Sequence, residues 1–155
     1  MSAPASHLDP FIANWNRVHN QSTRIMKSAP NDKFDWKPAD SAMPLGELMN
    51  HLYVAESLFI DSAVTGSFSR ENLPQAINDT DELIAAFDKL HQEGVAKIAS
   101  LTPEQMNEIV APFGPDKAMP RSFLMNVMLE HEIHHRGQLY TYLRILGCEC
   151  PALFG

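Results

Sequence analysis

The chain has 155 residues, a hydrophobic fraction of 45%, a charged fraction of 20% and a formal net charge of −7. This length and balance are typical of one globular domain, so residues 1–155 are expected to fold as a single unit. The acidic charge and the scattered Lys and Arg residues disfavour binding to nucleic acid, and the short apolar runs disfavour a membrane span.

The N-terminal segment and the first two predicted helices can be followed in chain order. Residues 1–10 lack the basic region and apolar core of a secretion signal, so a cytoplasmic location is expected. The first helix is predicted to begin at Asp9-Pro10, because proline suits the first helical position, and to end near Pro30. The second is predicted to open at Pro44, and its apolar stripe extends to Thr65-Gly66.

Two more helices are predicted beyond residue 66. Asp79 is a good capping residue for a third helix that runs to about Ser100. In the connection that follows, residues 108–111 are expected to be briefly extended, and the prolines otherwise disfavour regular structure up to residue 120. The last helix is predicted from about Arg121 to Leu146. Four amphipathic helices predict an all-α fold, a helix bundle.

The last helix carries the strongest chemical signal in the sequence. On a helical wheel, His131 and His135 fall in the middle of its apolar side, one turn apart, so their rings share a face. Two imidazoles at this spacing can chelate one divalent ion, whereas a core histidine without a metal needs hydrogen-bond partners in an apolar interior. On periodicity alone, His51, His19 and His91 all remain candidates for a third ligand.

The same helix also matches the H-E-x-x-H pattern of zinc peptidases through His131, Glu132 and His135. In those enzymes the glutamate is the general base, and a further ligand follows downstream. Only 20 residues follow His135, which leaves no room for a substrate-cleft domain, and Glu132 is expected to point away from the centre of the stripe. A peptidase is therefore disfavoured. The two cysteines of the chain, Cys148 and Cys150, are too few for a disulfide framework.

Several segments resemble a known superfamily. The run Pro44-Leu45-Gly46-Glu47-Leu48 before His51-Leu52, the Trp36-Lys37-Pro38 loop and the run from His131 to Leu139 are similar to those of the DinB/YfiT-like metalloproteins. The resemblance implies a four-helix bundle with long crossover connections and a homodimer. It also implies a zinc or nickel ion held by three histidines, which match His51, His131 and His135. Characterised members of the superfamily include thiol-dependent S-transferases and isomerases, and the resemblance extends over nearly the whole chain.

A site with three histidine ligands leaves coordination positions open, and the ion can lower the pKa of a water or thiol that binds there. We therefore expect a metal-dependent enzyme of the thiol S-transferase or hydrolase type acting on a small molecule. The alternative is a non-catalytic, dimeric metal- or ligand-binding module. Weak catalytic candidates are Glu56, Gln138 and Tyr142. Glu56 is expected either to orient a ligand histidine or to pair with Arg136, which is expected to point away from the centre of the stripe.

Overall fold

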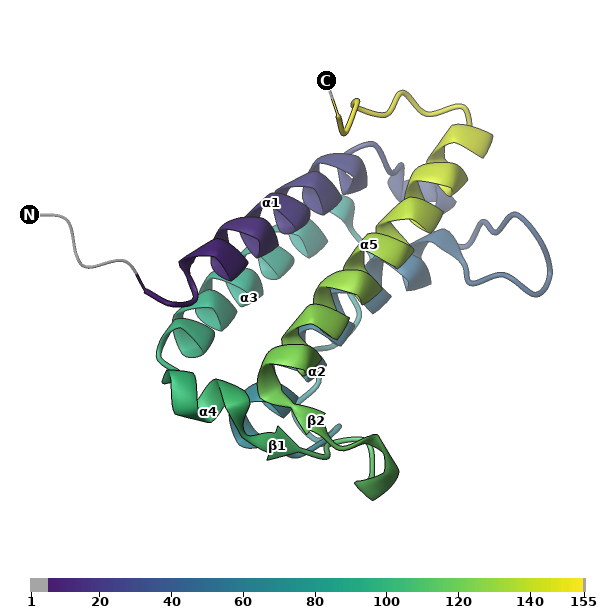
Figure 1. Ribbon diagram of the computed structural model, residues 1–155. Coiled ribbons are helices and arrows are strands. Elements are labelled where there is room, and N and C mark those ends of the chain that lie inside the picture. The colour runs from purple at the N-terminus through teal and green to yellow at the C-terminus, as the bar shows by residue number, and fades with distance from the viewer. Residues whose placement is uncertain (1–5, 155) are drawn as a thin grey trace, which may run out of the picture.

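The computed structural model describes residues 6–154, and four long helices make up most of this range (Figure 1). They are α1 (Asp9–Met26), α2 (Leu45–Thr65), α3 (Thr80–Ala99) and α5 (Arg121–Ile145). Helix α2 packs against α3 and α5, while α1 packs against the same two helices from the opposite side. The arrangement confirms the predicted all-α four-helix bundle.

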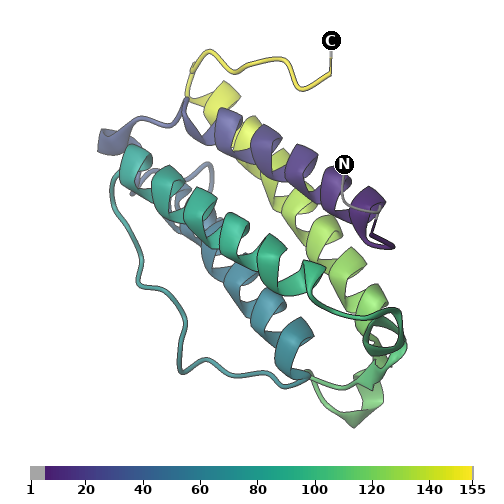
Figure 2. The same cartoon turned by 90° about the vertical axis from the view of Figure 1, so that its left-hand side faces the viewer.

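The connection between α2 and α3 is a long crossover. Residues 66–79 leave the end of α2 and return along the bundle (Figure 2). Near the start of α2, the Asn50 side chain accepts a hydrogen bond from the Ile77 backbone N–H and donates one to the Ile77 carbonyl oxygen. The crossover therefore runs the length of α2, and α2 and α3 point in the same direction.

The connection between α3 and α5 is more regular than the sequence pattern predicts. It contains α4 (Pro103–Asn107), a short 3-10 helix at Pro115–Lys117 and two short antiparallel strands, β1 (Ile109–Val110) and β2 (Met119–Pro120). Another short 3-10 helix, Asn31–Lys33, lies between α1 and α2. The extended segment at residues 108–111 is confirmed by β1. The expectation that prolines prevent regular structure up to residue 120 is wrong, because the connection contains α4, a 3-10 helix and β2. The Thr102 side chain and the Gln105 side chain form a reciprocal capping box that stabilises α4.

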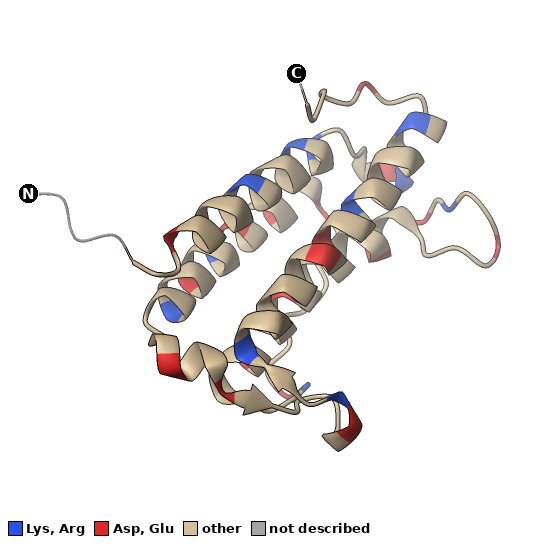
Figure 3. Cartoon of the chain, viewed as in Figure 1, with Lys and Arg blue, Asp and Glu red and all other residues tan. Residues whose placement is uncertain are grey.

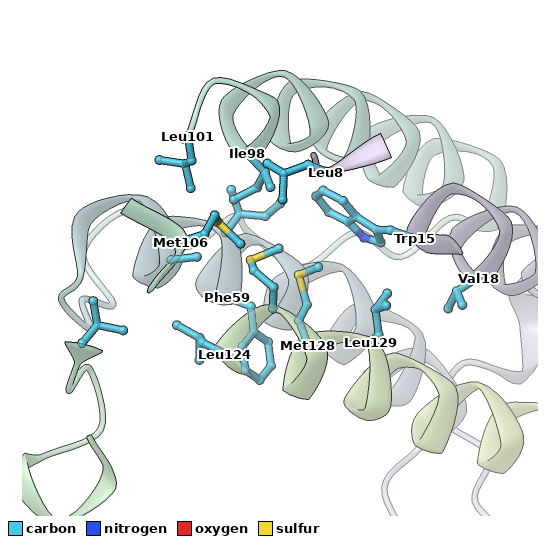
Figure 4. Packing of buried hydrophobic residues seen from close by; sticks show 14 of the residues in the cluster. Leu8, Trp15, Val18, Phe59, Ile98, Leu101, Met106, Leu124, Met128 and Leu129 are labelled. Carbon is cyan, nitrogen blue, oxygen red and sulfur yellow. The ribbon is translucent and has the colours of Figure 1, made fainter. Parts of the chain in front are cut away.

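Two apolar clusters fill the bundle, one towards each end. Trp15, Phe59 and Met128 belong to the first, and their side chains converge between the helices in Figure 4. Met26, Phe87 and other residues form the second. On α1, α3 and α5, buried polar residues lie between the positions that supply the two clusters, and Glu56 on α2 lies next to them through its contact with His91. This polar layer includes His19, Ser22, Glu56, His91, Glu132 and Arg136.

The surface of the bundle carries dispersed charge. Lys and Arg residues are scattered among Asp and Glu residues over the bundle, without a basic stripe in this view (Figure 3). Within the described residues, no helix combines the length and the apolar character that crossing a membrane requires.

Helix α2 begins in close contact with the loop before it, and this contact can be tested. A Cβ added at Gly46 would lie 2.6 Å from Phe34 Cδ2 and 2.9 Å from Phe34 Cβ. Gly46→Ala should therefore lower the free energy of unfolding, by about 1–3 kcal/mol as expected for an overpacked site. At Gly137, on the exposed side of α5, nothing lies within 4 Å of an added Cβ.

Gly137→Ala is thus the matched control, and it should raise the free energy of unfolding by about 0.5–1 kcal/mol because alanine favours the helix. Urea denaturation followed by circular dichroism measures both changes. Shifts of the same sign in the two variants would contradict the assigned role of Gly46.

Candidate metal centre

Three histidines from two helices meet beside the bundle core. The Nε2 atom of His51 on α2 lies 3.0 Å from Nε2 of His131 and 3.1 Å from Nε2 of His135, both on α5. All three side chains are half-buried, and their Nε2 atoms point to a common space. The structure thus brings together the three histidines that the family resemblance selected.

The donor set fits a divalent cation. The Nδ1 atom of His135 lies 2.7 Å from Oε1 of Gln138, an oxygen that can only accept, so Nδ1 carries the proton and Nε2 presents a lone pair. Burial lowers the pKa of His131 to about 4, with further contributions from His135 and His51. Burial also lowers the pKa of His51. These two imidazoles are therefore neutral at pH 7, which is the form that binds a metal ion.

The ligand histidines do not occupy the position on α5 that the helical wheel predicted. The buried stripe of α5 passes through Met125, Met128, Glu132, Leu139 and Leu143, and the prediction that His131 and His135 lie in its middle is wrong. They lie on its border, where one side faces α2 and the other faces solvent. A border position leaves both rings partly accessible to solvent.

Two of the three weak catalytic candidates lie on the ligand side of α5. Gln138 is exposed and holds His135 through the hydrogen bond already described, so it is a positioning residue. Tyr142 lies one turn further along and packs edge-on against Trp36, with ring centroids 5.8 Å apart. The structure gives Tyr142 a packing contact with the loop before α2.

A cavity of about 210 Å³ opens beside His51. One face of α2 forms one wall, and the crossover between α2 and α3 forms the other, with the lining residues His51, Val54, Ala55, Leu58, Arg70 and Leu73. Next to His131, the Phe59 ring lies 5.4 Å away between centroids, and Phe113 and Phe68 continue this aromatic row. The cavity is mainly apolar, and Arg70 is the cation in its lining.

The third candidate, Glu56, lies in a different group. Its Oε1 atom is 2.9 Å from Nδ1 of His91, and its Oε2 atom is 3.9 Å from Nδ1 of His19. The expectation that Glu56 orients a ligand histidine or pairs with Arg136 is therefore wrong. His19, Glu56 and His91 form a second, fully buried group that could hold a metal ion, with ligand atoms within 4.8 Å of one another.

Glu132 and Arg136 are also buried, although the wheel placed both away from the stripe. Oε1 of Glu132 accepts a hydrogen bond of 2.7 Å from Ser22, and Arg136 donates one of 2.7 Å to Gln21, both on α1. The sequence pattern misplaced them because charged residues interrupt an apolar stripe. Buried serine and glutamine on the facing helix are the partners that make such burial tolerable.

Burial controls protonation throughout this polar layer. It lowers the pKa of His19 and that of His91 to about 4, so both rings are neutral. It raises the pKa of Glu56 to about 8, and burial together with the nearby Glu56 charge raises the pKa of Glu132 to about 8. In the absence of a cation, both carboxyl groups therefore hold a proton at neutral pH.

Comparisons with known proteins place the chain in a family and a fold. Residues 14–139 match the family model described as the DinB superfamily. The uncharacterized protein YjoA of Bacillus subtilis (strain 168) is 29% identical over 140 residues, with 88% of this chain and 86% of YjoA covered. The uncharacterized protein YrdA of the same strain is 23% identical over 153 residues, with 96% of this chain and 88% of YrdA covered.

Two solved structures share the fold. The crystal structure of the DinB-like protein YjoA from Bacillus subtilis superposes with a TM-score of 0.78 at 25% identity, and covers 94% of this chain and 97% of its own. That of a DinB-like protein from Bacillus cereus ATCC 10987 gives a TM-score of 0.78 at 20% identity, and covers 95% and 97%. These matches confirm the family resemblance and the fold.

The protonation of Glu56 gives a pH-dependent prediction for the metal-free protein. A carboxyl group whose pKa rises from 4.5 unfolded to about 8 folded stabilises the fold fully below pH 4.5, and this contribution disappears as pH rises towards 8. Glu56→Gln keeps the shape but cannot ionise. The stability advantage of the native protein over this variant should therefore shrink between pH 5 and pH 8, by at least about 1.4 kcal/mol, the equivalent of one pKa unit.

Urea titrations in the presence of a chelator at the two pH values measure this difference. His19 and His91 act with the opposite sign, since their contribution is complete above pH 6.5 and is lost as pH falls towards 4. Both histidines are present in the native protein and in the variant. Glu93→Gln, at an exposed position of α3, is the control. An equal pH dependence in all three proteins would show that Glu56 is already ionised when buried.

Proposed function

The chain belongs to the DinB superfamily, and from this premise we propose that it is a metal-dependent enzyme acting on a small molecule, of the thiol S-transferase or hydrolase type. The observation that supports the proposal most directly is the convergence of three imidazole Nε2 atoms beside an apolar cavity. His51, His131 and His135 are the proposed ligands. Zinc or nickel suits three imidazoles, and the donor set accepts either.

The bound ion would supply a Lewis acid that generates a nucleophile, from a thiol or from water, at neutral pH. The protein contributes the surroundings. Gln138 fixes the orientation of the His135 ring through its Nδ1–H, so that the Nε2 lone pair keeps its direction. Of the three half-buried rings, His51 lines the cavity, while the Phe59 ring packs against His131.

The cavity indicates the kind of substrate. Val54, Leu58 and Leu73 offer apolar contact, and a volume of about 210 Å³ suits part of a small molecule and excludes a folded polypeptide. Arg70 forms no salt bridge with any residue in the 6–154 range, although it lies over the Phe68 ring, 5.6 Å from its centroid. We propose that Arg70 pairs with an anionic group of the substrate.

The ligand assignment predicts a change in metal content. His131→Ala should reduce the bound metal by one equivalent per chain, because two imidazoles on separate helices hold the ion far more weakly than three. His134→Ala is the matched control, since His134 is the exposed histidine three residues away on the same helix. Elemental analysis of both proteins, purified without a histidine tag, measures the difference. Equal metal content in the two variants would contradict the assignment.

The enzymatic proposal predicts turnover that requires the ion and Arg70. The metal-loaded protein should catalyse the reaction of a low-molecular-weight thiol with a chromogenic electrophile, or the hydrolysis of a chromogenic ester, above the rate of the metal-free protein. Arg70→Gln should raise KM about three- to tenfold for 3-mercaptopropionate, because one exposed charge-assisted hydrogen bond is lost. It should leave KM for 3-mercaptopropanol unchanged, since that thiol lacks the carboxylate.

Arg24→Gln, an exposed arginine at the end of α1, is the control and should alter neither constant. Equal effects of Arg70→Gln on the two thiols would refute the role of Arg70. No rate above the metal-free protein with any thiol or with the ester would instead favour a non-catalytic metal- or ligand-binding module.

A further inference from the structure

Within the polar layer, each of the four long helices contributes one imidazole or carboxyl group. His19 comes from α1, Glu56 from α2, His91 from α3 and Glu132 from α5. Their exposed fractions are 2%, 3%, 5% and 4%. Two imidazoles and two carboxyl groups facing one another in the core of a helix bundle form a donor set that suits a transition-metal ion.

Residues outside this layer fix the direction of both rings. The Nε2 atom of His19 lies 2.7 Å from Oδ1 of Asp88, and Nε2 of His91 lies 2.7 Å from Oδ1 of Asn16. These oxygens accept hydrogen bonds, so each Nε2 carries the proton and each Nδ1 presents a lone pair towards Glu56. Histidines that ligate a metal are commonly held in this way, by an oxygen acceptor on the opposite ring nitrogen.

Acceptor atoms therefore face one another without enough donors between them. Nδ1 of His19, Oε2 of Glu56 and Oε2 of Glu132 have no hydrogen-bond partner among residues 6–154. The Trp15 indole N–H lies near Glu56 without a hydrogen bond of normal geometry, and the Glu56 and Glu132 carboxyl groups interact with each other. One N–H cannot serve three acceptors, and two carboxyl groups can donate to each other only while a proton is present. The cluster needs added positive charge, which either protons or a metal ion can supply.

We propose that His19, Glu56 and His91 form a second site for a divalent transition-metal ion in the bundle core, with Glu132 as the neighbouring second negative charge. One divalent ion would balance the carboxylates of Glu56 and Glu132, and the buried Arg136 guanidinium adds a further positive charge that acts on Glu132. The Nδ1 lone pairs and the Glu56 carboxylate form the ligand set. Asp88 and Asn16 hold the two rings from outside, and Ser22 holds the neighbouring Glu132. This site shares no ligand with the group formed by His51, His131 and His135.

The orientation of the His19 and His91 rings shows which movement metal binding requires. His19 and His91 are stacked with an angle of 7° and centroids 3.9 Å apart. A metal ion lies in the plane of an imidazole that binds it, and two parallel planes cannot contain the same point. Binding therefore requires one ring to tilt. The His19 ring is the one we expect to tilt, because the side chain of its hydrogen-bond partner Asp88 is 46% exposed and can move with it.

Metal stoichiometry tests the second site independently of the first. Zn²⁺ titrated into the metal-free native protein by calorimetry should bind at two equivalents per chain. His51→Ala/His131→Ala should bind one equivalent, and the same protein with Glu56→Gln added should bind none. Glu93→Gln added in place of Glu56→Gln is the control and should keep one equivalent, because Glu93 is an exposed acid on α3.

The outcomes separate this proposal from the proposed function. If the native protein binds one equivalent and His51→Ala/His131→Ala binds none, the second site is refuted and protons alone occupy the cluster. If the single equivalent is lost with Glu56→Gln and kept in His51→Ala/His131→Ala, the second site stands and the first ligand assignment fails. Circular dichroism verifies that each variant is folded.

A spectroscopic readout covers the case in which Glu56→Gln does not fold. In His51→Ala/His131→Ala, Zn²⁺ should shift the Nδ1 resonances of His19 and His91 in ¹⁵N NMR spectra, and their stacked-ring shifts should disappear as one ring tilts. Unchanged His19 and His91 resonances at saturating Zn²⁺ would overturn the proposal. His7, which lies outside the cluster, supplies the internal reference signal.

Discussion

The packing of the four helices depends on how the buried polar groups between them are neutralised and hydrogen-bonded. Glu56 lies between two apolar clusters, and its Oε1 atom faces the His91 ring at 2.9 Å. A buried carboxylate without a counter-charge costs several kcal/mol, so this group must be neutralised wherever the helices pack. Asp88, Asn16 and Ser22 fix the groups around it, and each comes from a helix that the layer must hold in register. The layer therefore specifies how the helices align along the bundle axis.

Helix α5 serves the core and the proposed active site together. Its neighbours are α1 on one side and α2 on the other, so its buried surface is wide. Glu132 and Arg136 face α1, whereas His131 and His135 face α2 at the border with solvent. The adjacent residues His131 and Glu132 thus have different environments: His131 is half-buried at the border with solvent, and Glu132 is buried in the core. A substitution at Glu132 acts on the core, although it lies next to a proposed ligand in sequence.

Sequence periodicity predicts the four long helices and the pairing of His131 with His135, because both depend on spacing within one helix. It does not predict which helix supplies the third histidine; the family resemblance selected His51 over His19 and His91. The helical wheel did not predict the burial of Glu132 and Arg136, because it assigns buried positions from apolar residues alone. Their partners, Ser22 and Gln21, are distant in sequence. The Thr102 and Gln105 pattern is that of a capping box and could have predicted α4, but the prolines of this connection favoured irregular structure.

The crossover formed by residues 66–79 makes one wall of the cavity beside His51 without belonging to any helix. It is tied to α2 at Ile77, and it contributes little to the two apolar clusters. Mutations in this segment can therefore reshape the cavity at small cost in folding stability, as surface loops on a rigid scaffold generally permit. Lineages that keep the same histidines and the same bundle are free to diverge in what they accept, and a shared metal site is then a poor guide to a shared substrate.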